Sequence, residues 1–580
     1  MDAALVELLV TLEDKRSVLA RTLRPSIESA TESEILRSIA ALSAQTPATI
    51  DPITLPRRDG RDVGIIVLGC GRGAVARRLA TELRASAPSS TLIILETDVH
   101  RFLATLLMDE WTDLLADSRV RFAIGPYPDT ALREAVPPPA DPVLDFALGG
   151  LAMIPGDDPA HAGAIRNALQ TVAGTTLARF QSQSRQTEEE ATKKIEDGLP
   201  SGPWNLFSSV SEQTTALKTL APSIIAAARR AGHRGTTHSQ DDADPFRDSK
   251  ALRAALEADI DLVLSFLRPG GNVVSWLKGI PSLVLVSSHP HLLPIETFDW
   301  TDQDLVVVTD PTFASAYRSL GITPEIRPLA TEIPDDAAME SIVHPPCDVL
   351  SVGSIPSAAR VVEGLPPQLA ELIESLAADW VRHPRTTVDE LISTTNIKGD
   401  DRVMNAVRLA LGYAATRIRR IASVVALARA GFNVRVHGGA DWAAALRGTA
   451  AEGCWQGWLP AGPTQSAAFR DAGVVINVNS FATPGMLNMR SFDVPAAGGI
   501  LVCDDRPALH QAFQVGVEAL AFDRIEALPD LVSGVLASGS RREAIGLAGR
   551  NRVERTHSWD SWWTWAESRL RARFPDRTGH

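Results

Sequence analysis

Residues 63–83, VGIIVLGCGRGAVARRLATEL, precede a second apolar run at 91–98, TLIILETD. The first stretch has the pattern of a strand, a glycine-rich turn and a helix, and the second has the pattern of another strand. A strand that alternates with a helix at this pitch predicts a parallel sheet covered by helices. We therefore expect an α/β domain at residues 51–150.

The same alternation recurs twice further along the chain. Apolar runs of strand length lie at 260-IDLVLSF, 282-SLVLVSS and 304-DLVVVTD, and again at 347-CDVLSV, 432-FNVRVH, 473-GVVINV and 499-GILVCDD. Helical segments separate these runs, which indicates further parallel sheets. The expected fold class is α/β with three Rossmann-like domains.

Helical segments are expected around these domains. Apolar spacing of helical type fills the N-terminal segment until a proline-rich stretch at 47–56 ends it. The predicted order is a helical cap at 1–50, the first Rossmann-like domain at 51–150, a helical connector at 151–200, the second domain at 201–345, and the third at 346–580 with a helical insert at about 365–430.

Bulk properties exclude several classes of protein. The 580 residues are too many for one core, and the composition, 45% hydrophobic and 22% charged, is that of a globular protein. A net charge of −13 argues against broad binding of nucleic acid or of an anionic membrane. No apolar run is long enough for a membrane span, the N-terminus lacks the pattern of a signal peptide, and the four cysteines lack metal-ligand spacing. We expect a cytoplasmic protein without a metal.

Residues 484–505, PGMLNMRSFDVPAAGGILVCDD, carry the most informative motif. They predict a loop that opens a helix, whose free backbone N–H groups can hold phosphate oxygens. Arg490 adds a planar cation suited to a diphosphate, and Asp493, one helical turn later, can accept hydrogen bonds from a ribose diol. A surface helix followed by a core strand explains the same residue types equally well.

The run from Val474 to Trp563 resembles the C-terminal domain of the CgeB-like (spore maturation) glycosyltransferases, which belong to the two-domain GT-B class. The resemblance rests on Ile-Asn-Val at 476–478, 488-NMRSFDVPAAGG, Gly-Val-Glu at 516–518 and 549-GRNRVERTHSW. It implies that the last two domains form a GT-B pair, in which the third binds a nucleotide-diphosphate sugar and the second faces the acceptor. It also implies retention of anomeric configuration and no required cofactor.

Two positions depart from the pattern of that class. The family usually has a glutamate where this chain has Asp493, and many retaining GT-B enzymes carry a second glutamate at the position of Gly485. No carboxylate nucleophile is visible, so catalysis would rest on donor orientation and on Arg490 as the partner of the diphosphate. The donor-binding candidates are Gly353, Ser354, Gly438, Gly485, Asn488, Arg490 and Asp493. The dipeptides Gly353-Ser354 and Gly438-Gly439, each taken alone, also fit a plain strand-to-helix turn.

Segment 261–291 resembles the N-terminal, acceptor-side domain of the same class. His289 follows its last strand and is the candidate catalytic base or electrostatic contact to the sugar. A surface histidine next to a proline is the commoner alternative.

A second nucleotide site is suggested by Gly69, Gly71 and Gly73 with Glu96 at the end of the next strand. This pattern resembles S-adenosylmethionine methyltransferases and the Rossmann domain of Maf-type motility-accessory glycosyltransferases. The chain lacks an Asp/Asn-Pro-Pro-Tyr box after Glu96, which favours a non-catalytic domain.

Three functions remain open from the sequence. The first is sugar transfer from a nucleotide-diphosphate sugar to an unknown protein or glycan, for which the Maf-type resemblance suggests a surface or flagellar acceptor. The alternatives are an S-adenosylmethionine-dependent methyltransferase and a non-catalytic nucleotide- or carbohydrate-binding scaffold. Two further segments receive structural interpretations: 417-RIRR as a solvated helix end, and the tryptophans at 559–565 as packing between domains.

Overall fold

The computed structural model describes most of the chain. The described residues are 19–20, 23–24, 32–43 and 57–575, apart from 59–60, 63, 87–89, 109–110, 137, 139, 148–150, 157, 197–198, 212–214, 241–249, 251–253, 256–257, 267–279, 288–294, 341, 343, 358–366, 385 and 400. Within them, the mixed α/β class with three separate parallel sheets is confirmed.

The first unit is built on a four-stranded parallel sheet in the order β5-β4-β3-β6. Its strands are β3 (Gly64–Leu68), β4 (Leu92–Glu96), β5 (Val120–Ile124) and β6 (Leu151–Pro155). Every residue of β3 and β4 is buried, as expected for central strands covered by helices on both faces. Because β6 pairs with β3, this sheet extends into the segment predicted as a connector.

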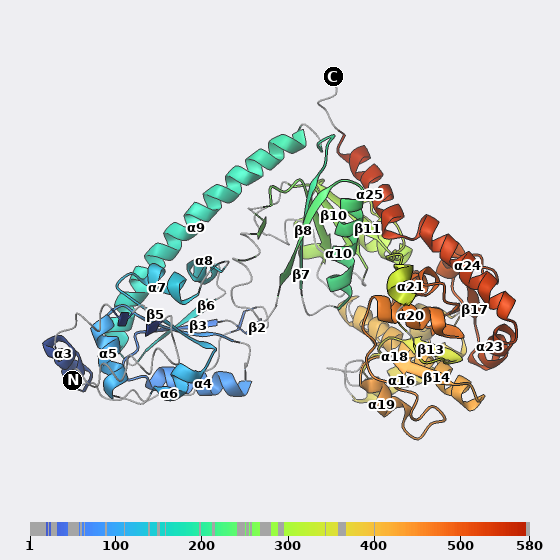
Figure 1. Cartoon of the computed structure of the whole chain (residues 1–580), viewed down its shortest axis with the longest axis horizontal. Coiled ribbons are helices and arrows are strands. Elements are labelled where there is room, and N and C mark those ends of the chain that lie inside the picture. Colours follow the sequence, from blue (N-terminus) through green and yellow to red (C-terminus); the bar gives the residue numbers. More distant parts are fainter. Residues whose placement is uncertain are drawn as a thin grey trace.

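Helices cover this sheet, and a short hairpin precedes it. The elements are α3 (Glu32–Ser43), β1 (Arg57–Arg58), β2 (Arg61–Asp62), α4 (Ala74–Ser86), α5 (Val99–Met108), α6 (Thr112–Ala116), α7 (Pro128–Ala135) and α8 (Pro142–Ala147). The long helix α9 (Pro159–Glu196) leaves the sheet and runs toward the second unit (Figure 1). One apolar cluster includes Leu144 and Phe180 together with Phe207 and Val263 of the second sheet.

The second unit contains a six-stranded parallel sheet in the order β12-β11-β10-β9-β7-β8. Its elements are β7 (Asn205–Ser211), α10 (Thr215–Arg230), β8 (Arg234–Gln240), β9 (Leu262–Phe266), β10 (Ser282–Val286), η2 (Ile295–Thr297), β11 (Asp304–Val308), η3 (Pro311–Phe313), α13 (Ala314–Arg318), β12 (Glu325–Ile326) and α14 (Asp336–Glu340). The three apolar strands lie where the sequence predicts them. β7, β8 and β12 were not predicted.

The third unit has a five-stranded parallel sheet in the order β14-β13-β15-β16-β17. Its strands are β13 (Val349–Val352), β14 (Val434–His437), β15 (Val474–Asn477), β16 (Leu501–Asp504) and β17 (Leu520–Phe522). The predicted helical insert comprises α16 (Pro367–Arg382), α17 (Val388–Ser393) and α18 (Asp401–Arg429). The remaining helices are α19 (Asp441–Leu446), α20 (Pro463–Asp471), α21 (Arg490–Ala496), α22 (Pro507–Ala512), η4 (Ile525–Ala527), α23 (Leu528–Leu536), α24 (Gly539–Thr556) and α25 (Trp559–Arg573).

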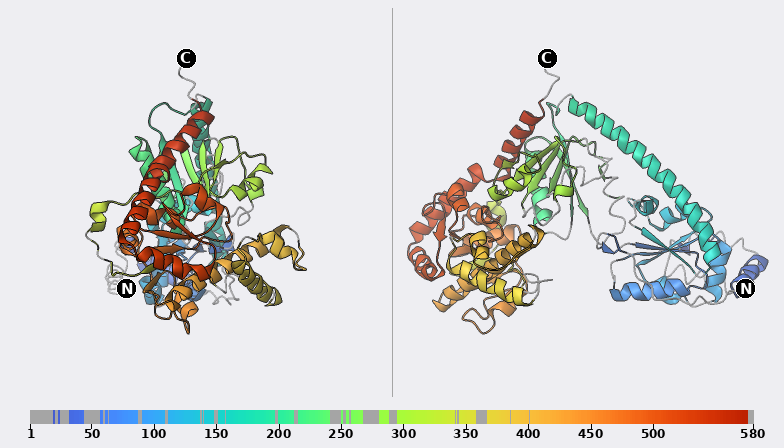
Figure 2. Two further views of the ribbon diagram at one scale, coloured as in Figure 1. Left: turned by 90° about the vertical axis from the view of Figure 1, so that its right-hand side faces the viewer. Right: turned by 180° about the vertical axis from the view of Figure 1, so that it is seen from behind.

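The last helix, α25, joins the third unit back to the second, where it packs along α10. Figure 2 shows this helix continuing from α24 up the side of the second sheet. The crossing is fixed at Thr331, whose N–H donates to His557 O at 2.9 Å and whose carbonyl accepts from Trp559 N at 3.0 Å. Trp562 and Trp563 are almost fully buried, which supports the interpretation of these tryptophans as packing between domains.

No helix among the described residues is both long enough and apolar enough to cross a bilayer.

Candidate active site at the carboxyl edge of the third sheet

The strands of the third sheet bring several predicted residues to one edge. Val352, the last residue of β13, is in register with His437 at the end of β14, so Gly353 and Gly438 follow adjacent strand ends. A Cβ on Gly438 would lie 2.4 Å from the carbonyl oxygen of Gly353. A Cβ on Gly353 would lie 2.7 Å from Cζ of Arg490. Glycine at both positions therefore allows the backbone and the Arg490 guanidinium to pack closely.

The guanidinium of Arg490 has no hydrogen-bond partner among the described residues, and its Nε is fully buried. Burial lowers the pKa of Arg490, and the charge of Asp493 opposes that shift. A cation taken out of water without a hydrogen-bonded partner is unfavourable unless a ligand supplies the counter-charge. Arg490 thus has the properties of an anion-binding residue.

A second guanidinium, that of Arg420 in α18, lies beside the first. Its Nε and Nη2 donate to Val478 O at 3.0 and 2.8 Å, and its Nη1 donates to Ser354 O. Burial and repulsion by Arg490 lower the pKa of Arg420 to about 9. Both arginines line a small void, together with Ser351, Val352, Gly353, Trp442, Ile476, Asn477 and Val478. Two cations and no carboxylate therefore border this void in the described part of the chain.

The interpretation of 417-RIRR as a solvated helix end is wrong. The run lies within α18, and Arg417 pairs with Glu374 on α16. Arg419 is only 2% exposed and donates to the carbonyl of Asp523 at 2.8 Å. The run is therefore a set of anchoring residues, one of which reaches the candidate site.

Three of the first four N–H groups of α21 are already hydrogen-bonded, so they are not free as the sequence motif predicts. Ser491 N donates to Asn488 O at 3.0 Å, and the N–H groups of Phe492 and Asp493 both donate to Met489 O. Phosphate binding would therefore depend on the two guanidiniums rather than on the start of α21.

Asp493 is partly buried and already has a partner. Its Oδ1 accepts a hydrogen bond from Thr331 Oγ1 at 2.5 Å, a contact that joins the third unit to the segment leaving the second. Burial raises the pKa of Asp493 to about 6, although the Thr331 hydrogen bond and Arg490 both act to lower it. This enclosed environment leaves Asp493 Oδ1 with a protein partner in place of the ribose diol that the sequence motif suggests.

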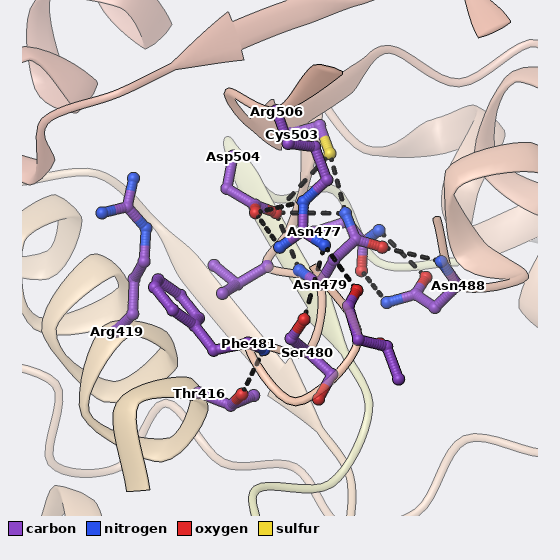
Figure 3. A network of polar contacts seen from close by, with 12 residues as sticks. Thr416, Arg419, Asn477, Asn479, Ser480, Phe481, Asn488, Cys503, Asp504 and Arg506 are labelled. Atoms are coloured by element: carbon purple, nitrogen blue, oxygen red, sulfur yellow. Dashed lines mark hydrogen bonds and ion pairs between the residues drawn. The ribbon is translucent and has the colours of Figure 1, made fainter. Parts of the chain in front are cut away.

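A polar network holds the loop between β15 and α21 (Figure 3). Asp504, buried at the end of β16, accepts from Asn479 N at 2.7 Å and from Arg506 Nε at 2.8 Å. Arg506 also donates to Met486 O at 3.0 Å. Asn488 exchanges two side-chain hydrogen bonds with Asn477, at 3.0 and 3.2 Å. Asn488, predicted to touch the donor, therefore fixes the loop in this structure.

Gly485 is pressed against the second unit. Its N–H donates to Asp310 Oδ2 at 2.9 Å, and a Cβ at this position would lie 2.3 Å from Asp310 Oδ1. Asp310 is fully buried and also accepts from Thr312 N and Thr312 Oγ1, at 2.9 and 2.6 Å. A carboxylate from the other unit thus contacts Gly485, the position at which the resemblance to retaining GT-B enzymes implies a glutamate, and it leaves no room for a side chain.

The two remaining residues predicted for the sugar-transfer site are Ser354 and His289. Ser354 is exposed, and its Oγ accepts from Gly439 N at 3.3 Å. His289 lies outside the described residues, so its proposed role stays a prediction.

The glycine turn of the first unit is packed by its own chain. Gly69, Gly71 and Gly73 all have positive φ. A Cβ on Gly73 would lie 2.4 Å from the Trp111 ring, and one on Gly156 would lie 1.9 Å from Gly69 O. The turn is therefore closed on two sides by protein atoms.

The acid of that predicted second site is also occupied. Glu96 is fully buried and accepts hydrogen bonds from Cys70 N at 3.1 Å and Asp98 N at 2.9 Å. Glu96 also contacts Cys70 Sγ at 3.2 Å and His161 Nε2 at 2.6 Å, and the hydrogen bond to His161 raises the pKa of His161. The second nucleotide site stays a prediction, but its acid holds the start of α9 to the sheet.

The comparisons with known proteins concern mainly the third unit. Residues 419–567 match the model of a glycosyl transferase-like family, a range that includes both arginines of the void. The chain is also similar to two solved structures at 11% identity, sucrose-phosphate synthase from Thermosynechococcus elongatus and HepE from Anabaena in complex with UDP-glucose. The first match covers 64% of this chain and 98% of the other at a TM-score of 0.36, and the second covers 63% and 100% at 0.37.

The comparison with curated protein sequences gave no match. At these TM-scores, the likeness to the two solved structures does not define the fold. The family match does not extend to the first two units. The third unit is thus similar to glycosyl transferases over the segment that supplies Arg420, Arg490 and Asp493.

Proposed function

We propose that this chain is a GT-B glycosyltransferase that takes a sugar from a nucleotide-diphosphate donor, whose diphosphate is bound by Arg490 and Arg420. The observation that carries the proposal is the guanidinium of Arg490, whose buried Nε has no partner among the described residues and which lies next to a second guanidinium, while no described carboxylate lines the void between them. The match of residues 419–567 to glycosyl transferase-like proteins supports the same reaction class.

The chemistry of sugar transfer explains why two cations would be placed there. When the bond between the sugar and the diphosphate breaks, negative charge grows on the departing phosphate oxygen. Fixed guanidiniums that form charge-assisted hydrogen bonds to that oxygen stabilise the transition state more than the ground state. The void is small, so the Arg490 side chain must move away from Gly353 to admit a diphosphate.

The finer assignments depend on the resemblance alone. They are the CgeB-like and Maf-type relationships, retention at the anomeric carbon, and a surface or flagellar acceptor. A cytoplasmic location is proposed from the bulk properties of the sequence instead. Of the rival functions, methyl transfer has the least support, because the acid and the glycine turn that would bind its cofactor are packed by protein groups.

The test is calorimetric titration of the full chain with UDP, GDP, dTDP and ADP. We expect at least one nucleotide to bind, and Arg490→Ala to weaken that binding ten- to hundred-fold. Arg417→Ala is the matched control on α18, since Arg417 pairs with Glu374 and does not line the void. Absence of binding by all four nucleotides, or equal affinities in the wild type and Arg490→Ala, would overturn the proposal.

A further inference from the structure

The start of the long helix α9 is joined to the first sheet by an ion pair that the proposed sugar transfer does not use. His161, in the first turn of α9, places its Nε2 2.6 Å from Oε1 of Glu96, the last residue of β4. The Glu96 side chain is fully buried, whereas that of His161 is 22% exposed. A carboxylate taken out of water needs a counter-charge and hydrogen bonds, so the state of His161 matters for the stability of this joint.

The imidazole also fills the place where a ligand of the glycine turn would lie. A Cβ on Gly69 would be 3.2 Å from Cδ2 of His161, so the ring lies directly against the turn. The thiol of Cys70, the next residue of the turn, contacts the other carboxylate oxygen of Glu96 at 3.2 Å. The acid that the sequence pattern assigns to a ribose diol therefore binds the chain's own helix.

A second ion pair holds the same turn of α9. Arg101 Nη2 lies 2.8 Å from Oδ2 of Asp158, whose Oδ1 accepts hydrogen bonds from two N–H groups of the first turn, that of His161 among them, at 3.1 Å. Arg101 Nε is also 4.0 Å from Oε2 of Glu96. The charged groups that face His161 are thus Glu96 on β4, Arg101 on α5 and Asp158 directly before α9.

The protonation of His161 decides whether Glu96 has a charged partner on α9. The hydrogen bond to Glu96 and the charge of that carboxylate raise the pKa of His161, although burial and Arg101 oppose the shift. Burial acts to raise the pKa of Glu96, but its contacts with His161 lower it overall. Because the pKa of an unfolded histidine is about 6.5, the stabilisation from His161 is complete below that pH and is lost as the pH rises through the higher folded value. The contribution of Glu96 is lost only in acid, as the pH falls through its own lowered pKa.

α9 connects this joint to the second unit (Figure 1). Ala162 and Ala173 of α9 belong to one buried apolar cluster with residues of β3 and β4. Further along the helix, Phe180 packs with Phe207 and Val263 of the second sheet. These apolar contacts do not titrate, so loss of the ion pair would loosen the first turns of α9 without detaching the helix.

We propose that His161 and Glu96 form a pH-dependent clamp, which fixes the start of α9 to the first sheet when His161 is protonated and loosens it when His161 is neutral. The clamp uses the acid and the glycine turn of the predicted second nucleotide site as a docking place for the chain's own helix. It sets how firmly the first unit is attached to the helix that reaches the second unit. The inference does not depend on the donor site at Arg490, which lies in the third unit.

Hydrogen exchange of the full chain, measured by mass spectrometry between pH 6 and pH 9, tests the clamp, because amide exchange reports local opening. We expect the protection factors of residues 158–170, corrected for the pH dependence of intrinsic exchange, to fall as the pH rises. Those of α4, which contains no histidine, should change little. His161→Gln keeps a side-chain donor but cannot carry a charge, so its protection at 158–170 should be lower at pH 6 and independent of pH. His100→Gln is the matched control, since His100 lies in the same unit, 3.8 Å from Glu34, and this variant should behave like the wild type.

Three outcomes would overturn the clamp. They are a pH-independent protection of 158–170 in the wild type, a fall that persists unchanged in His161→Gln, and an equal fall in α4, which would mean that the first unit as a whole loses stability. If His161→Gln does not fold, as judged by circular dichroism, Glu96→Gln removes the charge of the partner instead and should move the fall to lower pH. No nucleotide takes part in these measurements, so the donor proposal stands or fails separately.

Discussion

Replacing Arg490 with methionine should change stability and ligand binding in different ways. Methionine keeps much of the side-chain length but removes the charge. In the structure the guanidinium forms no hydrogen bond within the described residues, and its charge acts to lower the pKa of Arg420. The substitution removes repulsion from Arg420 and attraction to Asp493, and it removes no protein hydrogen bond, so the free energy of unfolding without ligand should change little.

The substitution Arg490→Met should instead lower the affinity for the nucleotide. A charge-assisted hydrogen bond is worth about 1.5–3 kcal/mol, which corresponds to roughly ten- to hundred-fold in affinity. Arg420→Met is the contrasting variant, because that arginine donates to the carbonyls of Val478 and Ser354. We expect Arg420→Met to lower both the free energy of unfolding, by about 1–3 kcal/mol, and the affinity.

Chemical denaturation without ligand and calorimetry with the nucleotide that binds best measure the two quantities. Circular dichroism at 25 °C checks that each variant is folded. Destabilisation by Arg490→Met of more than about 1 kcal/mol would mean that the arginine is a structural residue. An affinity equal to that of the wild type would mean that no phosphate contacts it.

Three further predictions follow from other contacts. Because the pKa of Asp493 is raised to about 6, the folded chain binds more protons there than the unfolded chain between about pH 4 and 6, and wild-type stability should fall as pH rises through this window. Asp493→Asn should remove that fall in stability, which is on the order of 2 kcal/mol. The measurement is denaturation of both proteins at pH 4 and pH 7. An equal change of stability between the two pH values in both proteins would contradict the prediction. Gly485→Glu should destabilise the chain by about 2 kcal/mol or more, since the new side chain meets the Asp310 carboxylate. Adding Asp310→Ala to this variant should restore part of the lost melting temperature. A Gly485→Glu protein that melts like the wild type would refute the close contact. Titration with S-adenosylmethionine should show no binding at micromolar ligand, because Glu96 is already hydrogen-bonded by His161, whereas tight binding would revive the methyltransferase hypothesis.

The sequence predicts those strands that are buried on both faces. β9, β10 and β11 are continuous apolar runs because helices and loops cover both faces of the sheet centre, and every one of their residues is buried. β8, RGTTHSQ, lies at the edge of the same sheet and is largely accessible, so it has polar residues and no hydrophobic pattern. A prediction based on hydrophobic patterns therefore misses such an edge strand.

The same distinction applies to the candidate site. Arg490 and Asp493 are found from sequence because they are three residues apart on one short helix, so local spacing alone places them together. Arg420 lies in an arginine-rich stretch whose pattern fits a solvated helix end, and only the packing of α18 beside the loop at Val478 brings it to the void. Asp310 is 175 residues from Gly485, and no spacing rule connects them.

The contacts of Asp310 and Thr331 explain why the candidate site depends on two units. Asp310 holds the loop at Gly485, and Thr331 holds the carboxylate of Asp493, so the segment that carries Arg490 is fixed on both sides by groups from outside the third unit. Thr331 is also the point where the backbone pairs with Ser558 at the start of α25. A rotation of the second unit against the third would therefore change the Gly485 and Asp493 contacts together. Since Arg490 has no hydrogen bond of its own within the described chain, its position follows from these neighbours, and opening of the units is the motion that would let a diphosphate reach it.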